Sequence, residues 1–294
     1  MSFLSYLING ISLGSVYAII ALGYTMVYGI AKMLNFAHGD VIMVGGFTIF
    51  YAVSMQSWPP LVGVLIAVVL CTVLGITIEY IAYRPLRQAA SSLAVLITAI
   101  GVSYLLQNLA LLLFGANPKA FTSVVTVPAL KLADGQLTIS GETIVTIVSC
   151  LVIMTGLMIF INKTKAGQAM LAVAEDKGAA QLMGINVNGT ISLTFAIGSA
   201  LAAIAGMLLC SAYPTLTPYT GSMPGIKAFV AAVFGGIGSI PGALIGGIVL
   251  GIIEILSKAY ISSQLADAIV FMVLIIVLLV KPTGILGKKI QEKV

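Results

Sequence analysis

Long apolar runs separated by short polar stretches make up most of this chain. Eight runs approach the length of about 20 residues that an α-helix needs to cross a bilayer. They cover residues 6–29, 40–57, 60–83, 92–115, 142–162, 190–212, 240–257 and 265–281. A ninth run, 226–237, is too short to cross alone and is bounded by Pro224-Gly225 and Gly235-Gly236. It predicts a broken or re-entrant helix, which is tolerated only inside protein or beside a water-filled cavity.

The composition sets the class of protein. Hydrophobic residues make up 60% of the 294 residues and charged residues only 8%, whereas soluble domains have about 25% charged residues. So few charges do not cover a water-soluble surface. We therefore expect an all-α integral membrane protein, a polytopic helical bundle of about eight transmembrane helices plus the short broken helix. Residues 1–294 are predicted to form a single transmembrane domain.

Many basic residues lie in loops that are separated by an even number of crossings if segment 226–237 crosses or nearly crosses the membrane. They are Arg84, Arg87, Lys163, Lys165, Lys177, Lys281, Lys288, Lys289 and Lys293. Because short cytoplasmic loops are rich in Lys and Arg, this side is predicted to face the cytoplasm. Lys119, Lys131 and Lys258 then fall on the other side.

Residues 116–141 form the predicted outward loop. The alternation near Thr122–Val127 indicates a short strand or an extended lid. The pattern leaves open the side of the membrane on which the N-terminus lies, and the placement of Lys32 and Lys227.

One long polar segment, residues 162–189, stands outside the apolar runs. Ala166–Ala174 contains good helix formers. Glu175-Asp176 is expected to start a second short helix, because carboxylates favour the N-terminal end of a helix dipole, and Gly184 is expected just after its end. Two alternatives stay open: a helix–kink–helix that docks in a groove of a partner, and an amphipathic helix that lies on the lipid surface.

Polar residues inside the apolar runs mark candidate pathway positions. Segment 34–40 contains Asn35, His38 and Asp40, and it is either a tight turn between helices or a re-entrant bend beside the substrate route. Gln107 and Asn108 lie within a spanning run, where an amide must hydrogen-bond to another helix or line a cavity. Both of those interpretations stay open.

Other features of the runs are predicted to be structural. Glu79 is near the cytoplasmic end of its helix, where a carboxylate can snorkel to the interface. Glu254 and Lys258 are four residues apart, in the favourable order for a helical ion pair. The glycine-dense stretch 235–247 predicts close helix packing. No chain of acids crosses the bilayer, which disfavours a proton-driven carrier.

The sequence offers no enzyme site. Its one histidine and three cysteines do not assemble a metal cluster at ligand spacing, and it contains no Gly-x-x-x-x-Gly-Lys-[Ser/Thr] loop. We therefore expect no catalytic residue, no metal and no cofactor in this chain; any ATP and Mg²⁺ are bound by partner subunits. The net charge of +5 is explained by basic residues that anchor loops at one membrane face, and we expect no nucleic acid partner.

Five motifs in order resemble a known family. They are Asn9–Ala18 followed by Ala21-Leu22-Gly23-Tyr24, Leu34–Asp40, Leu106-Gln107-Asn108, Ala174-Glu175-Asp176 through Met183–Asn186, and Gly235–Gly247. Together, and at this chain length, they resemble the permease subunit of bacterial branched-chain amino-acid ABC importers, the LivH type. Asp40 stands where many relatives carry glutamate, a departure that keeps the carboxylate.

The resemblance implies a type II ABC importer-like permease in the bacterial plasma (inner) membrane. A second homologous permease subunit, two cytoplasmic ATP-binding subunits and an extracytoplasmic amino-acid-binding protein would complete the machine. The cargo would be leucine, isoleucine or valine. By the same resemblance, Ala174, Glu175, Asp176 and Gly184 fall in a cytoplasmic coupling segment of about 163–189 that docks on an ATPase. The alternatives are the same machinery for urea or short amides and, in another class, a stand-alone channel or ion-coupled carrier.

Overall fold

The computed structural model describes residues 2–88, 92–132 and 137–287, and this part of the chain is mostly helical. Its main helices are α1 (Ser2–Ala31), α2 (His38–Phe50), α3 (Pro60–Ile78), α4 (Ser92–Phe114), α5 (Gly141–Lys163), α6 (Lys165–Glu175), α7 (Lys177–Leu182), α8 (Val187–Ala212), α9 (Ser222–Gly235), α10 (Ile240–Tyr260) and α11 (Ala266–Val280). Short π-helical turns, Tyr51–Met55 and Glu79–Tyr83, extend α2 and α3, and a 3₁₀ turn follows at Pro85–Gln88.

Within these residues, seven helices are long and apolar enough to cross a membrane. They correspond to the first seven predicted runs. The eighth run forms only the 15 residues of α11, and the ninth forms the 14 residues of α9. The predicted class, a polytopic helical membrane protein, is confirmed.

Glycines let the two most closely packed helices approach each other. α1 packs against α5, α8, α9 and α10, most extensively against α10. A Cβ added to Gly14 would lie 2.6 Å from the Cα of Ile248, and one added to Gly247 would lie 2.5 Å from the backbone nitrogen of Ala18. Small residues at such contacts let helix backbones pack tightly in a membrane, where burial of apolar area gives no driving force.

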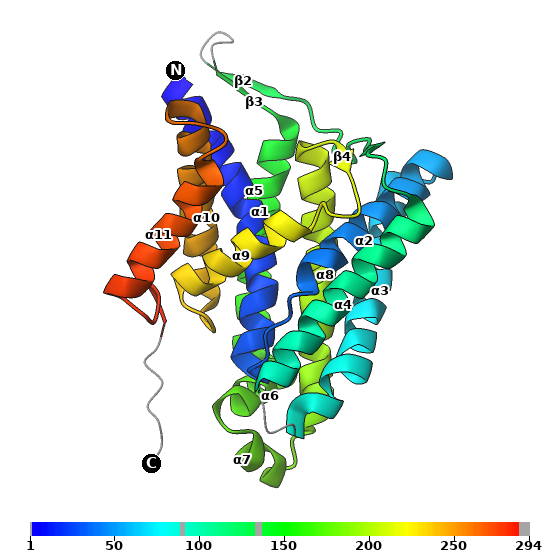
Figure 1. The fold of residues 1–294 in the computed structure, drawn as a ribbon, viewed down its shortest axis with the longest axis vertical. Coiled ribbons are helices and arrows are strands. Elements are labelled where there is room, and N and C mark those ends of the chain that lie inside the picture. The colour runs from blue at the N-terminus through cyan, green and yellow to red at the C-terminus, as the bar shows by residue number, and fades with distance from the viewer. Residues whose placement is uncertain (1, 89–91, 133–136, 288–294) are drawn as a thin grey trace.

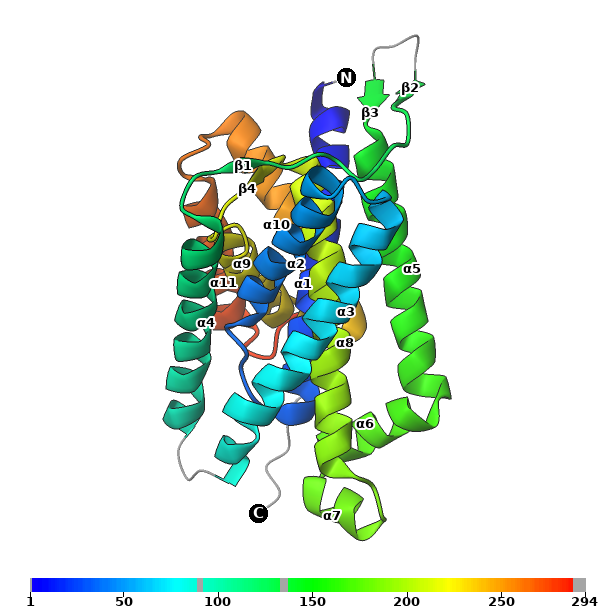
Figure 2. The ribbon, with the colours of Figure 1, turned by 90° about the vertical axis from the view of Figure 1, so that its right-hand side faces the viewer.

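The two ends of the bundle differ (Figure 1, Figure 2). One end carries the start of α1 and two small antiparallel pairs: β1 (Lys119–Ala120) with β4 (Thr215–Leu216), and β2 (Leu130–Leu132) with β3 (Leu137–Ile139). The opposite end carries α6 and α7. The chain therefore begins on the side of loop 116–141, a point that the sequence pattern left open.

The strand predicted near Thr122–Val127 is wrong. That stretch has no regular secondary structure, contains a bend at Val124, and pairs with no strand among the described residues. A nearby side chain provides a hydrogen-bond partner for its backbone: the amide of Val125 donates to the hydroxyl of Ser123 at 3.3 Å. The alternative of an extended lid stays a prediction.

Two helices begin inside the bundle rather than at its ends. After α1, the chain runs without helix through residues 32–37 before α2 starts. After α8, it runs without helix through residues 213–221 before α9 starts. The two helix N-termini meet: a Cβ added to Gly39 would lie 2.7 Å from the carbonyl oxygen of Gly221. Segment 34–40 is therefore a bend buried within the bundle and not a turn at the surface. α1 and α8 run in opposite directions through the bundle (Figure 1, Figure 2).

Candidate functional site

A small polar cluster sits where the N-termini of α2 and α9 meet. The Nε2 of Gln107 on α4 donates to Oδ1 of Asp40 at 2.9 Å, and it lies 3.3 Å from the hydroxyl of Ser103 and 3.4 Å from that of Ser222. The cluster thus joins three helices that are far apart in sequence. We call Asp40, Ser103, Gln107 and Ser222 the junction cluster. Asp40 and Gln107 were predicted as candidates, whereas Ser222 gave no signal in the sequence.

Two other predicted candidates do not reach the junction cluster. The side-chain amide of Asn108 donates to the carbonyl of Tyr104 on its own helix at 2.7 Å, on an exposed face of α4. His38 is buried and packs edge-on against Tyr24, with ring centroids 4.7 Å apart. Its Nε2 has no hydrogen-bond partner among the described residues and faces Gly23 of α1. His38 therefore fills the contact between α1 and α2.

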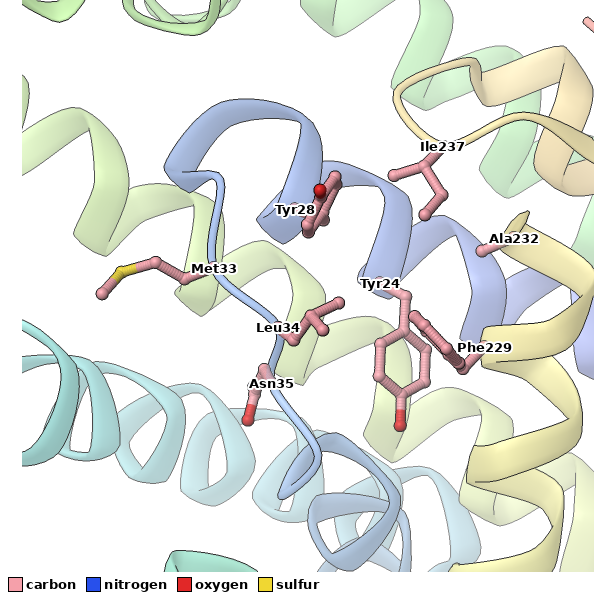
Figure 3. A pocket seen from close by; sticks show the side chains of 8 residues that line it. All are labelled: Tyr24, Tyr28, Met33, Leu34, Asn35, Phe229, Ala232 and Ile237. Carbon is pink, nitrogen blue, oxygen red and sulfur yellow. The ribbon is translucent and has the colours of Figure 1, made fainter. Parts of the chain in front are cut away.

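Asn35 lies beside a narrow pocket between α1, the bend and α9. Figure 3 shows that pocket, lined by Tyr24, Tyr28, Met33, Leu34, Asn35, Phe229, Ala232 and Ile237. The Tyr83 hydroxyl donates to Oδ1 of Asn35 at 3.1 Å. The pocket volume of about 10 Å³ is roughly that of one water molecule. In this conformation the pocket is too narrow for an amino acid.

A buried ionic knot closes the end of α3, on the side of α6 and α7. Glu79 is 0% exposed and pairs with Arg84 at 3.1 Å and with Arg87. The Ser192 hydroxyl of α8 donates to Glu79 at 2.6 Å, and Arg87 donates to Asn188 at 2.5 Å. Glu79 was predicted to snorkel; it is instead fully enclosed, because two arginines from the following turn bring their charge to it. The knot fastens α3 to the start of α8.

The polar segment forms an elbow of two helices. Thr164 caps α6 by accepting from the amide of Gly167 at 3.0 Å, and Asp176 caps α7 by accepting from that of Ala179 at 3.0 Å. Glu175 is the last residue of α6, so it does not start the second helix; Asp176 alone does. Gly184 follows α7 with φ of +81°, the left-handed conformation expected after a helix end.

The two parts of the elbow expose different surfaces. On α6, Met170 is 0% exposed and Val173 is buried, and the helix packs on α1, α5 and α8. At the end of α7, Leu182 is 90% exposed and Met183 is 82% exposed. The apolar face of α6 is therefore covered by this chain and is not free to lie on lipid, whereas the tip of α7 presents bare apolar side chains.

The side chain of Lys177 ties the elbow to the end of α1. Nζ of Lys177 on α7 donates to the carbonyl oxygen of Ala31 at 2.8 Å. Burial lowers the pKa of Lys177, and the nearby charges of Arg87 and Lys32 lower it further. The bond satisfies a carbonyl at the C-terminus of α1, where a cation is favoured. The elbow is thus coupled to the start of the buried bend.

Two helices whose N-termini meet inside the bundle, a polar cluster at that meeting point and a protruding elbow together define a helical membrane permease. Comparison of the sequence with known protein families identifies the family. The family model described as "Branched-chain amino acid transport system / permease component" matches residues 6–278. The chain belongs to this family of branched-chain amino acid transport permeases.

The similar proteins agree along the whole length of the chain. The LivH permease of the high-affinity branched-chain amino acid transport system is 45% identical in Salmonella typhimurium and 46% identical in Escherichia coli, each over 99% of this chain and 98% of the relative. The BraD permease of Pseudomonas aeruginosa is 42% identical over the same shares. Among solved structures, PsaBC from Streptococcus pneumoniae in complex with Fab aligns with 96% of this chain and 93% of its own at 16% identity and a TM-score of 0.48. That last similarity is too weak to bear on function.

Proposed function

We propose that this chain forms half of the translocation pathway of an ATP-driven importer of leucine, isoleucine and valine in a bacterial plasma membrane. The cargo named for its relatives and their similarity over 99% of the chain support this proposal. The structural observation that carries it is the junction cluster. Two half-helices that meet inside a bundle are the usual setting of a transporter's substrate site, because their N-termini attract the anionic group of a substrate.

The pathway residues follow from that geometry. The carboxylate of the amino acid lies near the N-termini of α2 and α9 and accepts from the side-chain amides of Asn35 and Gln107, while the Asp40 carboxylate accepts from the ammonium group. His38 and Asn108 are the less direct members of this set, because one fills a helix contact and the other bonds within its own helix. The narrow pocket beside Asn35 corresponds to a closed stage of the cycle.

The elbow faces the cytoplasm. Arg84, Arg87, Lys163, Lys165 and Lys177 lie at its end of the bundle, whereas Lys119, Lys131 and Lys258 lie at the other end, and this distribution follows the positive-inside rule. Lys32, next to Ala31, joins the cytoplasmic group. Lys288, Lys289 and Lys293 of the predicted basic C-terminus lie outside the described residues.

The elbow couples this subunit to an ATP-binding partner. Ala174, Glu175, Asp176 and Gly184 shape it, and the exposed Leu182 and Met183 at its tip suit an apolar groove. Two cytoplasmic ATPase subunits bind ATP and Mg²⁺, a second homologous permease completes the pore, and an extracytoplasmic protein delivers the amino acid. A nucleotide-driven movement shifts the permease only if the partner interacts differently with its two states. The Lys177–Ala31 bond offers such a connection to the bend.

Reconstitution tests the proposal. The complete transporter in proteoliposomes is expected to accumulate radiolabelled leucine only with ATP, and unlabelled isoleucine and valine are expected to compete. Competition by urea or acetamide instead would assign the other cargo. Leucine flux through the chain alone, without ATPase subunits, would show a stand-alone channel or carrier and overturn the proposal.

A further inference from the structure

A second charged cluster lies near the extracytoplasmic end of the bundle, apart from the junction cluster. Oε1 of Glu254 accepts from Nζ of Lys227 at 2.8 Å and from Nζ of Lys258 at 2.6 Å, while its Oε2 accepts from the Tyr17 hydroxyl at 2.8 Å. Lys227 also pairs with Asp267 at 2.7 Å. The sequence predicts only the Glu254–Lys258 pair; the other partners come from α1, α9 and α11.

These charges are costly in a membrane-spanning bundle. The side chain of Glu254 is 2% exposed and that of Lys227 is 7% exposed. Buried ion pairs add little net stability, because the loss of hydration offsets much of their attraction. Charged residues within spanning helices instead commonly mark a substrate or ion pathway. In a chain with so few charges, this cluster calls for a role beyond packing.

A cavity of about 190 Å³ lies beside the cluster. One water molecule needs roughly 10–15 Å³, so the space admits a molecule of amino-acid size. Leu13, Leu209 and Pro224 form apolar wall, and Glu254 and Lys258 supply opposite charges at one place. Lys258 is 36% exposed and uses one of its three N–H donors on Glu254, so its flexible stem leaves it free to swing toward a ligand.

We propose that this cavity binds the zwitterion of an aliphatic amino acid on its way into the permease. The carboxylate of the ligand pairs with Lys258, and its ammonium pairs with Oε1 of Glu254 beside Lys227. Its side chain lies against Leu13 and Leu209. The inference rests on the proposed function and adds a second, outer binding site to it.

Charge balance selects the ligand class. A zwitterion that inserts between Lys258 and Glu254 exchanges one ion pair for two and leaves each charge with a partner. A carboxylic acid without an amine leaves Glu254 one cation short, and an amine without a carboxylate leaves Lys258 unpaired. Each fragment forms only one of the two ion pairs, so both are expected to bind more weakly than the intact amino acid.

Equilibrium binding of radiolabelled L-leucine tests this site. The assembled transporter, with both permeases and both ATPases but without the extracytoplasmic binding protein, is placed in lipid nanodiscs. Saturable binding is expected, and Lys258→Gln is expected to weaken it about tenfold or more, the effect of losing one charge-assisted hydrogen bond. Lys131→Gln removes an exposed lysine at the same end of the bundle and is expected to bind leucine like the wild type.

Competition on the wild-type protein makes the test independent of any variant's folding. L-Isoleucine is expected to displace leucine, whereas L-leucinol and 4-methylpentanoate are expected to need at least about tenfold higher concentrations. Displacement by either fragment as readily as by isoleucine, undiminished binding in Lys258→Gln, or absence of saturable binding each overturns the inference. ATP-dependent leucine uptake is measured in parallel, with the extracytoplasmic binding protein present. If the wild type shows no uptake, the proposed function is overturned. If it shows uptake but no saturable leucine binding in nanodiscs, only the outer site is overturned.

Discussion

Nζ of Lys177 donates a hydrogen bond to the carbonyl oxygen of Ala31 across 146 positions of sequence. The bond joins the first residue of α7 to the last residue of α1. It connects the elbow to the end of α1, from which the chain leads into the buried bend. A movement of the elbow therefore reaches the end of α1 directly.

Removal of this bond is expected to weaken coupling. Lys177→Met keeps the length of the side chain and removes the donor, and a lost charge-assisted bond of about 1.5–3 kcal/mol corresponds to roughly a tenfold or larger drop in leucine-stimulated ATP hydrolysis. Lys165→Met, at the exposed start of α6, is the matched control. Equal behaviour of the two variants in an ATPase assay of the reconstituted complex would remove the Lys177–Ala31 bond from the coupling route.

The negative charge of Asp176 and its role as the cap of α7 can be tested separately. Asp176→Asn keeps an effective helix cap, whereas Asp176→Ala also removes the cap, which costs about 1 kcal/mol. If the charge docks on the ATPase, both variants lose substrate-stimulated hydrolysis; if only the cap matters, Asp176→Asn retains it. Charge reversal at both Glu175 and Asp176 is expected to abolish stimulation while the permease remains in the membrane, as fractionation and blotting would show.

The junction cluster predicts different effects for two adjacent amides. Gln107→Ala removes the bond to Asp40, and uptake of leucine is expected to fall about tenfold in rate divided by KM, since a buried carboxylate loses its donor. Asn108→Ala alters a residue that bonds within its own helix and is expected to change uptake little. Asn35→Ala is expected to resemble Gln107→Ala. Wild-type kinetics for Gln107→Ala at normal protein level would exclude it from the pathway.

The ionic knot at Glu79 is expected to matter for stability. Glu79→Gln leaves Arg87, whose side chain is 11% exposed, without its carboxylate. Breaking a buried pair on one side costs about 3–5 kcal/mol, and the partial exposure of Arg84 favours the lower end of that range. Thermal unfolding in detergent is expected to shift to lower temperature for Glu79→Gln and not for the exposed control Glu175→Gln. Identical unfolding curves would contradict the role of the knot.

Close helix approach gives a further contrast between glycines. A Cβ on Gly14 would collide with the backbone of α10, whereas a Cβ on Gly101 or Gly156 meets nothing within 4 Å. Gly14→Ala is therefore expected to destabilise the protein by about 1–3 kcal/mol through overpacking. Gly101→Ala is expected to be neutral or slightly stabilising, because alanine has the higher helix propensity. Thermal unfolding and expression level would measure both.

The sequence by itself determined the features that depend on neighbouring residues. Apolar runs predicted the spanning helices, because the length of a run and its lack of charge decide whether it crosses a bilayer. Glu175-Asp176 was predicted to start α7, and only Asp176 does so, as its cap, whereas Gly184 follows the end of α7 as predicted. The spacing of Glu254 and Lys258 predicted their ion pair, since one helical turn brings such residues together. These are local rules, and the chain obeys them.

Tertiary structure alone decided which distant residues meet. Asp40 and Gln107 are 67 positions apart and Tyr17 and Glu254 are 237 apart, so no local spacing points to either contact. Glu79 was predicted to snorkel to the membrane interface, but in the fold Arg84, Arg87 and Ser192 contact its carboxylate and bury it. The meeting of α2 and α9 was equally hidden, because Gly39 and Gly221 become neighbours only when both helices begin inside the same bundle. Helix packing, rather than helix formation, creates the polar sites of this permease.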